Sequence, residues 1–249
     1  GIGRIKILKK LKKLKNFFLK KNNMICIIQA RMSSKRFPNK MMKKILGKTL
    51  LERVVNQVLK SKYVNKVIVV TSNLRSDRPI VNFCKRNKIS YFSGSLNNVA
   101  KRYYEPLKNI NSKYFIRING DSPLIDPNLI DKFILQAKKT NLDIVTNCMH
   151  KTFPKGQSVE IIKTNTFKKS YKNIKKKYDR EHVTNFFYKN KNKFKIKNIY
   201  LKKNYNFINL CIDRSRDISI IKKILKRFNN QVPKIDIIIN NYKKILASK

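Results

Sequence analysis

The sequence ICIIQARMSSKRFPNK, residues 25–40, joins an apolar run to a loop of small and basic residues. The loop carries four cationic side chains, Arg31, Lys35, Arg36 and Lys40. A capping box follows, in which Thr49 precedes Glu52 by three residues, and it predicts the start of a helix. Backbone N–H groups at such a loop and helix start carry partial positive charge, so the order strand, loop, helix is typical of a phosphate-binding site. Any loop of so basic a chain would hold several cationic residues, however, and charge alone leaves both interpretations open.

The rest of the chain alternates short β-branched runs with amphipathic segments, which predicts an α/β fold around a mostly parallel sheet. We expect strands at residues 66–71, 89–93 and 114–118, and helices that begin near Asp77, Val99 and Asp126. Further on, we expect helices near Thr184 and Ile218 and strand-like segments at residues 143–147, 158–162, 195–200 and 207–213. No linker separates a second folded unit, so residues 24–249 are predicted to form a single domain.

The charge balance is strongly positive, with 60 Lys and Arg against 13 Asp and Glu and a formal net charge of +47. Such an excess ordinarily suggests a nucleic acid or an anionic membrane as partner. Here the basic residues run along the whole chain and are not gathered into one stripe or tail, which favours a solvated surface. The 41% of hydrophobic residues supports a real core, and the few carboxylates become the informative residues.

The four cysteines lie far apart with no paired spacing, so neither a disulfide framework nor a zinc site is indicated. This pattern favours a cytoplasmic protein. No stretch approaches the roughly 20 apolar residues of a membrane-spanning helix. Residues 1–23 would form a basic amphipathic helix, which could lie on a membrane surface. Because Met24 opens the first expected strand, this leader is equally well explained as a segment outside the fold.

Two carboxylates, Asp121 and Asp213, each follow an apolar strand-like run. Carboxyl ends of parallel strands meet at the edge of the sheet where ligands bind in open α/β folds. Carboxylate oxygens there would suit Mg²⁺, which is commonly held by one or two carboxylates and by substrate phosphates. Asp121 is also explained as an ordinary turn residue, and position alone does not decide between the two roles.

Several ordered motifs together resemble a known family. They are IIQARMSSKRFPNK, RINGDSPLIDP, FPKGQSVEII, DREHVT and NLCID. The chain from Met24 to about Phe228 resembles cytidylyltransferases that activate acidic sugars, above all the spore-coat polysaccharide biosynthesis protein F type. That type is related to the acylneuraminate and 3-deoxy-manno-octulosonate cytidylyltransferases. The resemblance implies a nucleotide-diphospho-sugar transferase fold, a Rossmann-like, GT-A-like arrangement in three layers.

The same resemblance implies roles for particular residues. Arg31, Lys40 and Asp121 would be catalytic, with Asp121 and Asp213 as ligands of Mg²⁺. The nucleotide would contact Ala30, Arg31, Ser33, Ser34, Arg36, Lys40, Arg117 and Asn119. The sugar would contact Lys155, Gln157, Glu160, Arg180 and His182. Two of these groups have plainer explanations, since Arg117 and Asn119 could form an exposed strand end and His182 could simply begin a helix.

The chain departs from the family pattern at two places that bear on the site. Asn39 stands where the family commonly has Gly, and Asn tolerates a left-handed backbone less readily. After Asp213, family members usually show Pro and acidic residues, whereas Arg214, Ser215 and Arg216 intervene here before Asp217. This second departure weakens the metal role expected of Asp213.

We therefore expect a Mg²⁺-dependent enzyme that transfers CMP from CTP to a sugar acid for surface polysaccharide or glycan biosynthesis. Family resemblance also implies a homodimer and no specific nucleic-acid partner. One rival is a catalytically inactive α/β protein that binds nucleic acid, which a steep salt dependence of binding would support. Another is a glycosyltransferase that uses a finished nucleotide sugar, which the intact RMSSKRFPNK loop disfavours.

Overall fold

A seven-stranded sheet forms the centre of the computed structural model, which describes residues 24–247. Its strand order is β5-β4-β1-β6-β8-β7-β9. The parallel half consists of β1 (Met24–Gln29), β4 (Val64–Ser72), β5 (Ser90–Gly94) and β6 (Tyr114–Asn119). Beyond it, β8 (Glu160–Lys163) runs antiparallel to both neighbours, β6 and β7 (Ile144–Thr146), and β9 (Ile196–Asn198) is parallel to β7. The mostly parallel α/β sheet predicted from the sequence is confirmed.

Helices cover both faces of the sheet and give three layers. One face is covered by α2 (Leu50–Leu59), α3 (Arg78–Arg86) and α5 (Pro127–Thr140), which share a core with β1 and β6. The opposite face is covered by α4 (Val99–Leu107), α6 (Thr164–Ser170) and α8 (Asn185–Lys189). The short helix α7 (Lys177–Glu181) lies beside α4. Strand β1 contributes to both cores because its alternate side chains point to opposite faces.

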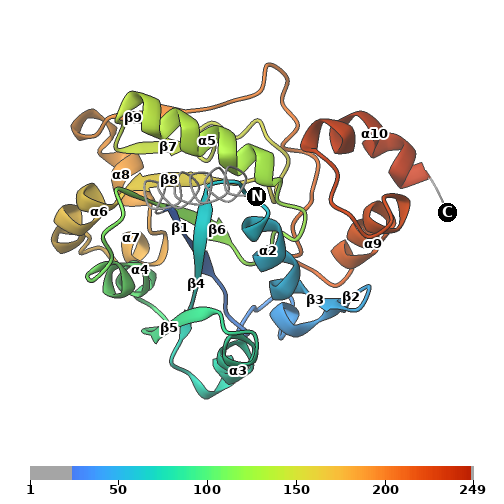
Figure 1. Ribbon diagram of the computed structural model, residues 1–249, viewed down its shortest axis with the longest axis horizontal. Coiled ribbons are helices and arrows are strands. Elements are labelled where there is room, and N and C mark those ends of the chain that lie inside the picture. The colour runs from blue at the N-terminus through green and yellow to red at the C-terminus, as the bar shows by residue number, and fades with distance from the viewer. Residues whose placement is uncertain (1–23, 248–249) are drawn as a thin grey trace, which may run out of the picture.

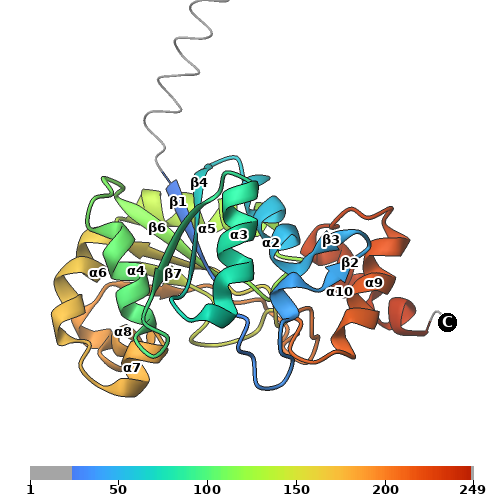
Figure 2. The ribbon, with the colours of Figure 1, turned by 90° about the horizontal axis from the view of Figure 1, so that it is seen from below.

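The last two helices, α9 (Asp217–Arg227) and α10 (Ile235–Ala247), lie together at one end of the molecule, next to the hairpin of β2 (Lys44–Ile45) and β3 (Lys48–Thr49). Figures 1 and 2 show them at the opposite end from α6. Four 3₁₀ turns complete the described elements: η1 (Lys40–Met42), η2 (Arg75–Asp77), η3 (Tyr171–Asn173) and η4 (Lys191–Lys193).

Two helix starts follow the signals read in the sequence. Thr49 Oγ1 accepts a hydrogen bond from Glu52 N at 3.2 Å, and Glu52 Oε2 accepts one from Thr49 N at 3.3 Å. The capping box is therefore present at α2. At α5, Asp126 caps the helix by accepting from Asn128 N at 2.8 Å, with Pro127 in the first turn.

The expected strand at residues 207–213 is wrong. This segment makes only an isolated bridge, between Asn209 and Lys155, within the part of the chain that the structure describes. Its backbone is held by a few separate hydrogen bonds, Lys155 N to Ile208 O, Leu210 N to Lys155 O and Ile212 N to Asp121 O, each at 2.9 Å. Since these partners lie on two different loops, no regular ladder forms, although the apolar residues at 208, 210 and 212 are buried.

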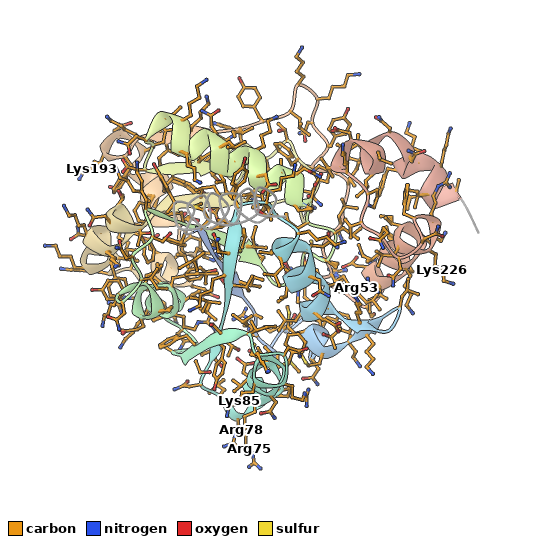
Figure 3. All side chains as sticks on the ribbon, viewed as in Figure 1. Arg53, Arg75, Arg78, Lys85, Lys193 and Lys226 are labelled. Atoms are coloured by element: carbon orange, nitrogen blue, oxygen red, sulfur yellow. The ribbon has the colours of Figure 1, made fainter. Side chains whose placement is uncertain are left out.

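The positive charge is spread over the surface. Figure 3 shows Arg75, Arg78 and Lys85 pointing outward at one end, with Lys193 and Lys226 on two other sides. Arg53, by contrast, is buried and donates to the carbonyl of Ile45 in the β2–β3 hairpin. Among residues 24–247, no helix is long and apolar enough to cross a membrane. The leader at residues 1–23 lies outside the described residues.

All four cysteines are free, as their spacing predicted. Burial raises the pKa of Cys84, Cys148 and Cys211 to about 12. The thiols therefore remain protonated at neutral pH.

Candidate active site

The loop after β1 closes on itself through Met32. The carbonyl of Met32 accepts hydrogen bonds from Ser34 N at 2.9 Å and Asn39 N at 3.0 Å. Asn39 has φ 59° and ψ 14°, so the position takes the left-handed conformation that glycine adopts most readily. Asn is among the few other residues that adopt it at modest cost. The departure from glycine therefore leaves the turn of the loop intact.

A buried carboxylate holds this loop against the sheet. Asp77 Oδ1 accepts from Met32 N at 2.7 Å, and its Oδ2 accepts from Ser72 N at 3.0 Å and from Thr71 Oγ1 at 3.1 Å. Its side chain is fully buried at the start of α3. A carboxylate is acceptor-only when ionised, so it suits a point where several donors converge. Asp77 thereby fixes the loop relative to the ends of β4 and α3.

The turn after β6 approaches the end of β1 closely. Gly120 N donates to Gln29 O at 2.9 Å, and a Cβ on Gly120 would lie 2.8 Å from that same carbonyl. A side chain at this position would therefore push the two strand ends apart. Glycine is required here by the close backbone approach, which places Asp121 directly opposite the β1 loop.

The charged centre of the site forms around Lys40. Its Nζ lies 3.0 Å from Asp121 Oδ2, 3.4 Å from Asp213 Oδ1 and 2.7 Å from the carbonyl oxygen of Ile212. Arg36 Nη2 also reaches Asp213 Oδ1 at 3.0 Å. The lysine side chain is only 7% exposed, whereas Asp121 and Asp213 keep 27% and 36% of theirs exposed. Three oxygens thus converge on one buried cationic atom.

Asp213 is held in position by Asp217, the next carboxylate along the chain. Asp217 Oδ2 accepts from Asp213 N at 2.8 Å and from Arg214 N at 2.7 Å, while its Oδ1 accepts from Asn209 at 3.3 Å. These bonds tighten the segment that carries Asp213 onto the start of α9. The three residues that intervene before Asp217 therefore leave Asp213 beside Asp121.

These groups line one cleft at the carboxyl ends of β1 and β6, with a volume of about 280 Å³. Both the β1 loop and the C-terminal half of the chain contribute to it. Lining residues are Gln29, Arg31, Ser34, Arg36, Lys40, Met41, Val99, Arg117, Asn119, Gly120, Asp121, Glu181, His182 and Asp213. The lining contains both cationic side chains and the Asp121–Asp213 pair, so the cleft suits an anion together with a cation.

A buried ion pair forms the floor of this cleft. Arg117 on β6 is paired with Glu160 on β8, and Glu160 also accepts from the hydroxyl of Tyr188. Burial lowers the pKa of Arg117, but the adjacent Glu160 outweighs it and holds that pKa above its ordinary value. Burial, with the Glu160 charge, raises the pKa of Tyr188. Arg117 is therefore charged and fixed, with one edge exposed to the cleft.

Comparison with known proteins identifies this arrangement. A family model described as Cytidylyltransferase matches residues 25–244. The chain belongs to the cytidylyltransferase family. It is thereby a nucleotidyltransferase that takes its nucleotide from CTP, and its fold is the one predicted.

Relatives and a solved structure agree. An uncharacterized protein of Methanocaldococcus jannaschii is 36% identical over 209 residues, which cover 82% of this chain and 84% of that protein. The spore coat polysaccharide biosynthesis protein SpsF of Bacillus subtilis is 31% identical over 117 residues, 45% of this chain and 49% of the relative. The structure of a cytidylyltransferase from Leptospira borgpetersenii superposes with a TM-score of 0.81 at 27% identity, covering 91% of this chain and 98% of that one. The match to SpsF thus spans about half of either protein.

The cytidylyltransferase cleft offers a donor set that fits a hard divalent cation. Among the described residues, no group of three or more His, Cys, Asp and Glu side chains could hold a metal. Two carboxylate oxygens and a backbone carbonyl nevertheless converge on the positively charged ammonium of Lys40. Mg²⁺ commonly takes only one or two carboxylates from the protein and completes its shell with phosphates and waters. The residues therefore fit Mg²⁺ bound together with a nucleotide.

The residues expected at the nucleotide divide into those in the cleft and those near it. Arg31, Ser34, Arg36, Lys40, Arg117 and Asn119 line it. Ala30 is buried beneath, where its N donates to Val70 O at 3.0 Å. Ser33 is exposed and is absent from the lining. The structure therefore gathers most of the predicted nucleotide contacts in one place.

The residues expected at the sugar are more scattered. His182 lines the cleft, and Glu160 reaches it only through Arg117. Arg180 borders a separate hollow of about 520 Å³ beside α4. Lys155 is exposed, and its backbone carries the segment that leads to Asp213.

Gln157 differs from its expected role. It is completely buried, and its side chain is used at both ends, by Asp126 N at 3.0 Å and by the carbonyl of Leu124 at 2.6 Å. Both partners belong to the turn after β6, so Gln157 supports that turn and does not face the cleft. The physical reason is that a buried turn needs its backbone groups satisfied.

Three residues of the site were missed by sequence reasoning. Asp77 was read only as the start of a helix, although a carboxylate that follows a strand in so basic a chain was a usable signal. Glu181 lies beside His182 in the quoted DREHVT motif and lines the cleft with it. Gln29 ends β1, and its Oε1 lies 3.4 Å from Arg117 Nη2. Nothing in the local sequence distinguishes Gln29 from an ordinary strand end.

Proposed function

We propose that the chain is a Mg²⁺-dependent cytidylyltransferase that transfers CMP from CTP to a hydroxyl of a sugar acid and releases pyrophosphate. Its product would serve surface polysaccharide or glycan biosynthesis. The observation that carries the proposal is the convergence of Asp121, Asp213 and Lys40 next to the cationic β1 loop. Such a site can hold a triphosphate and a divalent cation side by side.

The reaction needs alignment and neutralisation of charge more than it needs covalent help from the protein. The acceptor hydroxyl attacks the α-phosphorus of CTP, the bond to the β-phosphate oxygen breaks, and pyrophosphate leaves with that oxygen. Arg31, Arg36 and Lys40 supply positive charge beside the phosphates. Mg²⁺ on Asp121 and Asp213 would neutralise negative charge that develops on the phosphate oxygens.

The acidic acceptor is supported by the charge of the cleft and by the motif resemblance. His182 and Glu181 line the same cleft as the β1 loop, where His182 could orient a carboxylate or take the proton of the attacking hydroxyl. Arg117, held by Glu160, adds a fixed guanidinium to the lining of the cleft. We also propose a homodimer, which the resemblance supports, in the cytoplasm, which the unpaired spacing of the cysteines favours.

The test is pyrophosphate release by the purified chain with Mg²⁺, each of the four common nucleoside triphosphates and a panel of sugar acids. Release is expected only with CTP and one class of acceptor. Asp121→Ala should abolish it, while Asp236→Ala, which removes an exposed carboxylate on α10, should not change it. Equal pyrophosphate release by Asp121→Ala and Asp236→Ala would show that Asp121 is not part of the active site.

The nucleic-acid hypothesis is tested on the same preparation. The result that favours nucleic-acid binding is a folded protein that releases no pyrophosphate with any pair of nucleoside triphosphate and sugar acid. The same protein would bind RNA with a steep salt dependence. The dispersal of the basic residues around the molecule in Figure 3 argues against such binding.

A further inference from the structure

Three oxygens of the kind that bind hard metal ions surround the ammonium of Lys40. Its Nζ lies within 3.4 Å of a carboxylate oxygen of Asp121, a carboxylate oxygen of Asp213 and the carbonyl oxygen of Ile212. The lysine side chain is 7% exposed, so its ammonium is largely withdrawn from water. An ammonium buried in this way loses its hydration and depends on these three oxygens for compensation.

We propose that Lys40 closes the cation site in the nucleotide-free enzyme and opens it when a triphosphate binds, so that metal and nucleotide enter as a coupled pair. The inference rests on the proposed function, because it takes Asp121 and Asp213 as the metal ligands. Lys40 is then a gate as well as a phosphate contact.

The coupling follows from the sharing of one position. A divalent cation and an ammonium repel each other, so the two cannot both lie between Asp121 and Asp213. Metal alone must displace Lys40 from its three oxygens and leave a largely buried ammonium with nothing in exchange. A triphosphate in the same cleft offers the ammonium new anionic oxygens, and the two carboxylates then need a replacement cation.

Arg36 does not act as the same kind of gate. Among the described residues it forms an ion pair with Asp213 alone of the two carboxylates, and its side chain is 62% exposed, so it can turn into solvent at little cost. Lys40 is the residue that bridges both carboxylates from the buried side. Its replacement by methionine keeps the unbranched apolar stem and removes the charge.

The experiment is a titration of the nucleotide-free protein with Mn²⁺, in which electron paramagnetic resonance counts the free ion. Wild type, Lys40→Met and Lys43→Met are compared. Lys43 is an exposed residue just after the same turn, so its variant loses the same formal charge without touching the oxygens. Lys40→Met should bind Mn²⁺ more tightly than wild type, by about 5- to 150-fold if the coupling has its usual size. Lys43→Met should match wild type.

Folding is followed in the same samples by thermal denaturation. Lys40→Met leaves two carboxylates facing each other, so its melting temperature should fall without metal and rise on addition of Mn²⁺ by more than that of wild type. Mn²⁺ affinity of Lys40→Met equal to or below that of wild type would overturn the gate. An equal gain in Lys43→Met would also overturn it, since general relief of positive charge would then be the cause.

Failure of the proposed function gives a different result. If Asp121→Ala binds Mn²⁺ as tightly as wild type, the carboxylates are not the metal ligands, and the proposed chemistry fails before Lys40 is considered. If Asp121→Ala loses Mn²⁺ and pyrophosphate release stays intact in wild type, while Lys40→Met shows no gain, only the gate fails.

Discussion

At the scale of single residues, the buried pair of Arg117 and Glu160 controls the floor of the cleft. The two face each other in register across β6 and β8. Their side chains are 15% and 2% exposed. Removing one charge from such a pair leaves the other buried without compensation. Which strand pairs with β6 is a property of the sheet, so the sequence suggested a sugar contact for Glu160 and could not reveal its partner.

Glu160→Gln should lower the free energy of unfolding by about 3–5 kcal/mol, because the buried guanidinium of Arg117 loses its carboxylate. Urea denaturation measures this loss of stability. Glu105→Gln is the control, since Glu105 makes an ion pair with Lys108 at the surface of α4. The midpoint of urea denaturation of Glu105→Gln should equal that of wild type. A Glu160→Gln midpoint that also equals wild type would show that the pair carries no net stability.

Asp77 illustrates a second residue whose importance depends on the folded chain. Its carboxylate gathers donors from Met32 in the loop after β1 and from Thr71 and Ser72 at the end of β4. Asp77→Asn replaces one acceptor oxygen with a donor, so at least one buried donor loses its partner, at a cost of about 1–3 kcal/mol. Since Met32 fixes the β1 loop, the variant should also bind CTP more weakly. Calorimetric titration with CTP checks this.

The matched control for Asp77→Asn is Asp236→Asn, an exposed carboxylate on α10. It should retain the CTP affinity of wild type. If Asp77→Asn loses stability but keeps its CTP affinity, Asp77 supports the fold without setting the geometry of the loop. Lys40, Asp121 and Asp213, by contrast, lie within motifs that can be read in the sequence, and the structure brings the three side chains together.

At the scale of elements, the alternating pattern predicted the strands and helices of the main sheet up to α5 within a few residues, but not the short β2–β3 hairpin. Helix caps gave the starts of α2 and α5, since capping depends on side chains close in sequence. The antiparallel direction of β8 and the irregular path of residues 207–213 depend on contacts distant in sequence. Helix α10 was missed, although its isoleucines at 235, 238 and 245 are buried in the core shared with α5.

Helix α10 should therefore contribute strongly to stability. Its first residue, Ile235, donates from its N to Asp126 Oδ2 at 3.0 Å, which ties it to the turn after β6. Ile238→Ala should lower the free energy of unfolding by about 2–5 kcal/mol, because Ile238 is fully buried. The neighbouring Ile237 is 41% exposed, so Ile237→Ala should change it by less than about 0.5 kcal/mol. Similar losses in both variants would contradict the observed packing of α10.

At the scale of the whole molecule, composition predicted the charge but not its effect on the fold. The full chain has a net charge of +47, and the basic side chains labelled in Figure 3 point outward on several sides of the molecule, which implies repulsion among them. Within residues 24–247, ion pairs involve only five cationic side chains, those of Arg36, Lys40, Lys108, Arg117 and Lys189, and several of these pairs lie at the surface. Repulsion among unpaired cations therefore outweighs attraction in pairs at low ionic strength.

Salt should consequently stabilise this protein. Raising the ionic strength from about 0.01 M to about 0.15 M shortens the Debye length from about 30 Å to about 8 Å, which screens repulsion between distant surface charges. The buried Arg117–Glu160 pair is screened much less, so its contribution persists. The melting temperature should therefore rise over this range in NaCl and KCl alike, as followed by circular dichroism. A melting temperature that falls with salt would mean that attractive pairs dominate the electrostatic energy, and that the basic surface is more organised than its dispersal suggests.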